Sequence, residues 1–156
     1  MNAHEQLNTL LREDIGQLET LADVLRREKA ALAAADVSPL QEVTAEKNRL
    51  LEGVRERAKT KIRLLVSMGY KPNAGEPSRF IRAGGLDELY ELWKMADKRL
   101  RECQAINQNN GRVLGHMQKR LSKLTEIFRG ASAQQKLYGA QGQQTNVSST
   151  NILASA

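Results

Sequence analysis

The chain has 156 residues, a formal net charge of +6, one cysteine and 4% aromatic residues. This length suits one domain with a hydrophobic core, and a composition rich in Leu, Ala, Arg, Glu, Lys and Gln is typical of an all-helical protein. One cysteine excludes an intrachain disulfide, and no stretch approaches the roughly 20 apolar residues of a membrane-spanning helix, so we expect no membrane insertion. The basic residues are spread thinly along the chain, which argues against a nucleic-acid-binding surface.

The first predicted element is an amphipathic helix over residues 3–35. Its apolar residues recur at helical spacing and predict a face that packs in a bundle. Asp14 and Glu28 fall on positions of the same stripe. We interpret these charges as a sign that the stripe rotates away from strict heptad positions, or that one side of the stripe remains exposed to solvent. The main apolar positions are Leu7, Leu11, Leu18, Leu21, Leu25 and Leu32.

The second predicted helix covers residues 39–68. Ser38 is expected to cap it, with Pro39 at the first helical position and Gln41 completing a capping box. The short link predicts that the first two helices form an antiparallel hairpin. Gly69 should terminate the second helix, and Phe80 and Ile81 should pin the turn-rich connection 69–85 to the end of the bundle.

The third predicted helix covers residues 86–128 and carries a seam of thirteen positions spaced three then four residues apart. Eleven of these positions are apolar, which predicts one long helix packed against the hairpin as a three-helix bundle or coiled coil. Cys103 lies on the seam and should act as a small core residue. Asn107, Asn110 and Gly111 interrupt it. Two interpretations remain open: a polar layer of the core, or a break between a scaffold half and a binding half.

The C-terminal end of the third helix should be left uncovered by the hairpin. At about 1.5 Å per residue the hairpin helices are roughly 45–50 Å long and the third helix about 65 Å. An exposed apolar stripe of this size marks a partner site or a self-association site. The expected partner-binding residues on this helix are Asn107, Asn110, Gly111, Leu114, Met117, Leu121, Leu124 and Phe128.

Residues 131–156 form a predicted polar binding tail. They contain one charge, Lys136, and fifteen Ser, Thr, Asn, Gln or Gly residues, too little apolar surface to fold alone. Spaced apolar side chains make the segment a candidate disordered binding tail. These are Leu137, Tyr138, Val147, Ile152 and Leu153.

No catalytic constellation is recognisable in the sequence. His4 lies near the terminus, His116 is isolated, and no Glu-x-x-His pair suits a di-iron bundle. The glycines fit neither a P-loop nor a dinucleotide fingerprint. We therefore expect a protein-binding protein, with no enzymatic activity, metal or cofactor. Acidic groups in residues 1–13, where a secretion signal needs a basic region and an apolar core, predict a cytosolic location.

Three short motifs resemble those of the FlgN-type flagellar export chaperones. Residues 107–114 (NQNNGRVL) resemble the family's Asn-x-x-Asn-Gly pattern followed by apolar residues, and residues 137–143 (LYGAQGQ) resemble its tail motif. Glu46 and Lys47 precede Leu50 and Leu51 as a Glu-Lys pair precedes a Leu doublet in the family. The order and spacing of the motifs extend the resemblance over nearly the whole chain.

The resemblance implies a cytosolic bacterial chaperone that binds hook–filament junction (hook-associated) proteins before their export by the flagellar type III apparatus. It also implies that the client is held near the C-terminus and that Tyr138 docks on the export gate. The connection 69–85 departs from shorter relatives, so no function is carried onto it. Two alternatives remain: a coiled-coil homo-oligomer or adaptor, and a basic helical nucleic-acid-binding protein.

Overall fold

A computed structural model describes residues 1–137, with the backbone alone for Phe128 and for residues 131–137. The helices are α1 (Ala3–Ala33), α2 (Leu40–Ser67), α3 (Pro77–Ala83) and α4 (Asp87–Leu137), with one 3₁₀ turn, η1 (Pro72–Ala74). Residues 1–137 contain no strand, so the predicted all-α class is confirmed.

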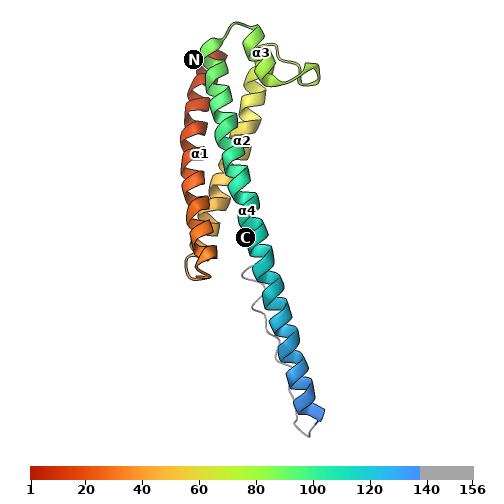
Figure 1. The fold of residues 1–156 in the computed structure, drawn as a ribbon. Coiled ribbons are helices and arrows are strands. Elements are labelled where there is room, and N and C mark those ends of the chain that lie inside the picture. The colour runs from red at the N-terminus through yellow and green to blue at the C-terminus, as the bar shows by residue number, and fades with distance from the viewer. Residues whose placement is uncertain (138–156) are drawn as a thin grey trace.

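α1 lies at the centre of the contacts between the long helices. It runs antiparallel to α2 and parallel to α4, and packs against both, whereas α2 and α4 touch each other much less (Figure 1). α3 packs on the start of α4. α4 has 51 residues and α1 has 31, about 76 Å against about 46 Å. α4 therefore projects well beyond the turn between α1 and α2 (Figure 1).

The helix ends follow from local sequence signals in most cases. Asn2 accepts from the Glu5 backbone N–H at 2.9 Å while the Glu5 carboxylate accepts from the Asn2 N–H, a complete capping box. Gly69 follows α2 with φ +106°, and the next N–H bonds back to the Leu65 carbonyl at 3.0 Å. This geometry confirms the predicted glycine stop, because a residue with a Cβ is strained at that φ.

The start of α2 differs from the expectation. α2 begins at Leu40, its N-cap is Pro39, and no side chain caps it, so the predicted Ser38 cap and capping box are wrong. Instead the Ser38 N–H donates to Asp36 Oδ1 at 3.1 Å. Asp36 thus accepts the hydrogen bond in the link, next to Ala35, which has a positive φ of 52°.

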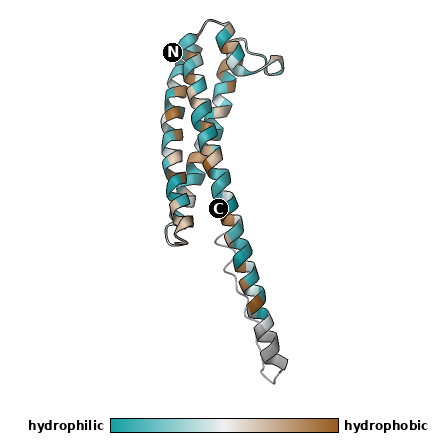
Figure 2. Cartoon of the chain, in the orientation of Figure 1, coloured by the Kyte–Doolittle hydropathy of each residue, from teal (hydrophilic) through white to brown (hydrophobic). Residues whose placement is uncertain are grey.

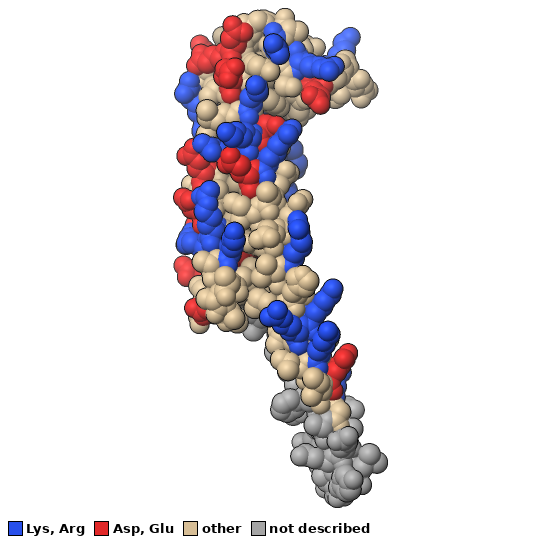
Figure 3. All heavy atoms as spheres, in the orientation of Figure 1, with Lys and Arg blue, Asp and Glu red and all other residues tan. Residues whose placement is uncertain are grey.

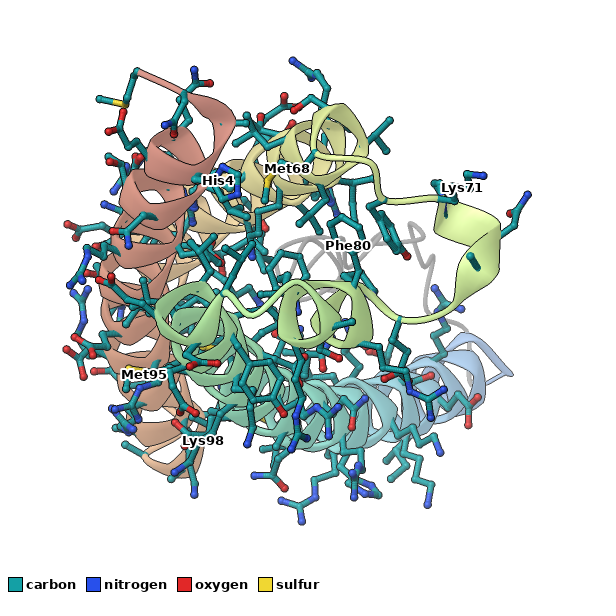
Figure 4. The ribbon with its side chains drawn as sticks, turned by 90° about the horizontal axis from the view of Figure 1, so that it is seen from above. His4, Met68, Lys71, Phe80, Met95 and Lys98 are labelled. Atoms are coloured by element: carbon teal, nitrogen blue, oxygen red, sulfur yellow. The ribbon has the colours of Figure 1, made fainter. Side chains whose placement is uncertain are left out.

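The core is divided into three successive apolar clusters along the bundle. The cluster near the N-terminus contains Leu7, Leu11 and Leu65 and is closed by Ile81, which is fully buried, and by the partly buried Phe80. The connection thus packs onto the bundle end where Met68 and Phe80 lie, while Lys71 points outward (Figure 4). Apolar and polar residues alternate along the helices, and apolar residues recur along α4 beyond the hairpin (Figure 2).

α4 is longer than the sequence indicates. The helix passes through Gly111 without a break and reaches Leu137, the last residue described, whereas the spacing of apolar residues predicts an end at 128. We call residues 115–137 of α4 the overhang, because Leu114 is the last α4 residue with a described side chain that is buried. Among the described residues, no helix is both long and apolar enough to cross a membrane.

Candidate protein-binding site

The overhang begins where the apolar seam of α4 leaves the hairpin. Leu114 is buried against Ala31, Leu32 and Leu40, which lie at the α1–α2 turn. The next seam residues, Met117 and Leu121, pack against the edge of that cluster and are only partly buried. The seam therefore passes gradually from the core into solvent, because α1 ends at Ala33 and α4 continues.

Two apolar side chains of the overhang are largely exposed. Leu124 is 59% exposed and Ile127 is 67% exposed, the highest values after Met1 among the large apolar side chains that the structure describes. They are three residues apart and so lie on one face of the helix, next to Leu121. Together with Met117 and Leu121 they form what we call the apolar stripe of the overhang. A helix face of this kind can bind an apolar or amphipathic segment of a partner.

Ile127 was missed by the sequence analysis because it lies off the strict three-four spacing of the seam. Beyond the hairpin no other described helix covers α4, so an apolar residue that lies off the seam is exposed as well (Figure 1). The i, i+3 spacing from Leu124 is the signal that could have identified it. The Phe128 and Leu137 side chains are not described, and Tyr138, Val147, Ile152 and Leu153 lie outside the described residues.

Basic residues adjoin the apolar stripe on one side. Arg112, Lys119, Arg120 and Lys123 are exposed, and the sequence has no acidic residue between Glu102 and Glu126. None of the ion pairs among the described residues involves these four side chains. They form a positive surface on α4 next to the end of the hairpin (Figure 3). A partner with acidic groups beside its apolar face would complement it.

Asn107 and Asn110 lie inside the bundle rather than on the overhang. Asn110 is 2% exposed, and its Nδ2 donates to the Leu25 carbonyl and to Glu28 Oε1, both at 2.9 Å. Lys47 Nζ donates to Glu28 Oε2 at 2.9 Å and to Asn107 Oδ1 at 3.5 Å. These contacts match the interpretation of the asparagines as a polar core layer. Gly111 is exposed and helical.

Asp14 and Glu28 are also buried, which corrects the expectation of a rotated stripe or a wet flank. Asp14 is 1% exposed and accepts from Arg57 Nε at 2.7 Å and from Lys61 Nζ. A buried carboxylate is tolerable only with such partners. Basic side chains of α2 supply them, so strict heptads persist.

The lone cysteine is a core residue, as predicted. Cys103 is buried in the central cluster and its Sγ donates to the Leu18 carbonyl at 3.3 Å. Burial raises the pKa of the Cys103 thiol above its ordinary value, Glu102 raises this pKa further, and Arg26 lowers it. The thiol is therefore held in its neutral form.

The other candidate sites in the described part of the chain offer weaker grounds for a function. A cavity of about 450 Å³ lies between the starts of α1 and α4, bordered by polar residues that include His4, Asn8 and Glu88. Among residues 1–137, no group of three or more His, Cys, Asp or Glu side chains is arranged to hold a metal ion. The overhang is therefore the strongest candidate for a functional surface.

Comparison with known proteins agrees with the sequence motifs. The model of the FlgN protein family matches residues 1–146. A curated relative from Proteus mirabilis, named flagella synthesis protein FlgN, is 30% identical over 142 residues, which cover 89% of this chain and 90% of that protein. No solved structure matches significantly. A match of this extent shows that the chain belongs to the FlgN family.

Proposed function

We propose that this protein is a cytoplasmic export chaperone that binds hook-associated proteins, keeps them soluble and delivers them to the flagellar export gate. The observation that carries the proposal is the overhang, where Leu124 and Ile127 are exposed on a part of α4 that the other described helices leave uncovered (Figure 1). Family membership and the name of the Proteus mirabilis relative support a role in flagellar synthesis.

The stripe is suited to cover an apolar helix face of a client before assembly. Met117 to Ile127 span ten helical steps, about 15 Å, which matches roughly three turns of a docked helix. Burial of each large apolar side chain contributes about 1.5–3 kcal/mol, so a few such contacts hold a client reversibly. The client face would otherwise be free to aggregate, and its coverage is what a chaperone provides.

The charges around the stripe define the kind of client segment. Arg120 lies one turn from Leu124, and Arg112, Lys119 and Lys123 follow one another at helical spacing on the adjoining surface. An amphipathic segment with acidic residues beside its apolar face fits this arrangement. Opposite charges would speed association and fix the orientation of the docked segment.

We assign delivery to the tail. Tyr138 offers a rigid aromatic ring and one hydroxyl group, which suits a transient contact with an export-gate component. The Tyr138→Ser variant should bind the client with unchanged affinity and fail to bind the gate. Normal gate binding together with loss of client binding would place Tyr138 in the client site instead.

The proposal is tested by mixing the purified protein with a purified hook-associated protein and measuring the mass of the complex by sedimentation. A defined complex and suppression of client aggregation on heating are expected, with flagellar hook subunit as the control protein. No complex with any hook-associated protein would contradict the proposal. If the chain alone formed a concentration-dependent dimer that Leu124→Ser abolished, the stripe would serve self-association.

A further inference from the structure

Two polar layers cross the bundle, and each joins α1, α2 and α4. In what we call the lower layer, Lys47 of α2 donates to Glu28 of α1 and to Asn107 of α4, while Asn110 donates to Glu28. In the upper layer, Lys61 and Arg57 of α2 donate to Asp14 of α1, and Lys61 Nζ lies 5.5 Å from the centre of the Trp93 ring of α4.

The two layers are related by the same shift on every helix. Asp14 and Glu28, Lys61 and Lys47, and Trp93 and Asn107 are pairs of residues fourteen positions apart, or two heptads. The direction is reversed on α2, as its antiparallel course requires. α4 also bonds to successive carbonyls of α1 one heptad apart, from Cys103 to Leu18 and from Asn110 to Leu25. Both layers therefore follow from the same heptad alignment of the three helices.

The apolar part of the seam cannot fix this register by itself. Leu11, Leu18, Leu25 and Leu32 repeat every seven residues on α1, so a one-heptad slip of a neighbouring helix again places apolar side chains against leucine. Buried charges behave differently. A slip of α4 would remove Asn110 from Glu28, whose side chain is only 3% exposed, and a buried carboxylate that loses a hydrogen-bond donor is unfavourable.

We propose that the two polar layers act as a register lock that sets how far α4 projects beyond the hairpin. A slip by one heptad moves α4 by roughly 10 Å along α1, which would either draw Leu121 and Leu124 towards the hairpin or expose Leu114. Glu28, Lys47 and Asn110 are therefore positioning residues for the overhang. The lock is a property of the chain alone and does not depend on which partner the overhang binds.

The register can be measured directly with two spin labels, one on the bundle and one on the overhang. Lys29→Cys and Ser122→Cys lie on exposed positions of α1 and α4, and Cys103→Ala removes the native thiol. The lower layer is then made apolar with Glu28→Leu, Lys47→Met and Asn110→Leu. A matched control carries the same kinds of change outside the layer: Glu46→Leu at a partly exposed position, and Arg27→Met and Asn109→Leu at exposed positions.

Pulsed electron paramagnetic resonance should give one narrow distribution of the distance between the two spin labels, both for the labelled parent and for the control. The apolar-layer variant should stay helical and unfold at equal or higher urea, because apolar replacement of buried ion pairs is often neutral or stabilising. Its distance distribution should nevertheless show a second peak displaced by roughly 10 Å. A folded variant with only the native distance would overturn the proposal.

A single substitution keeps the proposal testable if the triple variant does not fold. Asn110→Leu removes the α4 donor of the lower layer and leaves the Glu28–Lys47 ion pair between α1 and α2 in place. This variant should show a minor second distance, since only the hold on α4 is weakened. If the triple variant does not fold and Asn110→Leu keeps the single native distance, the layers do not set the register.

Discussion

The Nδ2 atom of Asn110 on α4 lies 2.9 Å from the carbonyl oxygen of Leu25 on α1, so a helix is held to its neighbour by a side chain bonded to backbone. The same atom donates to Glu28. We expect Asn110→Ala to lower the free energy of unfolding by about 2–3 kcal/mol, because a buried hydrogen bond to a charged group is lost. Urea denaturation followed by circular dichroism measures this.

Asn109 provides the control, as it is the same residue type one position earlier and is exposed. Asn109→Ala should change the free energy of unfolding by less than about 0.5 kcal/mol. Alanine has a higher helix propensity than asparagine, so equal losses at the two positions would contradict the assignment of the loss to the buried contact.

A second prediction contrasts a buried ion pair with an exposed one. Lys47→Met leaves the Glu28 carboxylate buried without its charge partner, and should cost about 3–5 kcal/mol of unfolding free energy. Arg27→Met breaks the Arg27–Glu46 pair, in which the arginine side chain is well exposed, and should cost at most about 1 kcal/mol. Similar midpoints for the two variants in urea would contradict the account of the polar layer.

A third prediction concerns the turn that joins α1 and α2. Ala35 has a φ of 52°, which costs an L-residue about 1–2 kcal/mol and glycine almost nothing. Ala35→Gly should therefore raise the free energy of unfolding by about 0.5–1 kcal/mol, after the larger entropy of glycine in the unfolded chain is subtracted. Ala34→Gly, at an ordinary helical φ of −81°, should lower it. The prediction fails if both glycines destabilise the protein.

A fourth prediction follows from the raised pKa of Cys103. Between the ordinary thiol pKa of 9.0 and the raised pKa of the folded state, the folded protein keeps a proton that the unfolded chain loses. The contribution of the thiol to stability is thus complete below pH 9.0 and falls as the pH rises above it.

The Cys103→Ala variant lacks this titration and isolates it. The unfolding free energy of the parent, measured in urea at pH 7 and pH 10, should fall more than that of the variant over the same interval. A parallel pH dependence of the two proteins would mean that the pKa of the thiol is not raised in the folded state.

The fold class and the helix ends set by backbone chemistry could be predicted from the sequence. The long seam of α4 is visible in the sequence as the spacing of apolar residues. Gly69 indicates a position of positive φ, because glycine is the residue that most readily adopts it. The start of α2 could not be predicted in the same way. Ser38 and Asp36 are both good turn formers, and the sequence shows neither that Asp36 accepts the hydrogen bond nor that Ala35 takes a positive φ.

The polar layers and the full apolar stripe needed the structure. Asp14 and Glu28 disturb the pattern of α1 alone, and their basic partners become visible only when α2 is aligned antiparallel to it. Ile127 lies off the heptad seam and is exposed because no other described helix covers α4 beyond the hairpin (Figure 1). Both the polar layers and the extent of the apolar stripe depend on which helices pack together, and a single sequence does not show this.

The most direct test of the central claim is the affinity of a hook-associated protein for the Leu124→Ser, Ile127→Ser double variant, measured by isothermal titration calorimetry. The comparison is Ile62→Ser with Val66→Ser, two exposed apolar residues of α2 that are 36% and 47% exposed. Both variants should keep parental helicity and melting. The overhang variant should lose at least about tenfold in affinity, since tenfold corresponds to about 1.4 kcal/mol and two apolar contacts are removed. The α2 variant should bind like the parent. Parental affinity in the overhang variant, or an equal loss in the α2 variant, would contradict the assignment of the client site to the overhang.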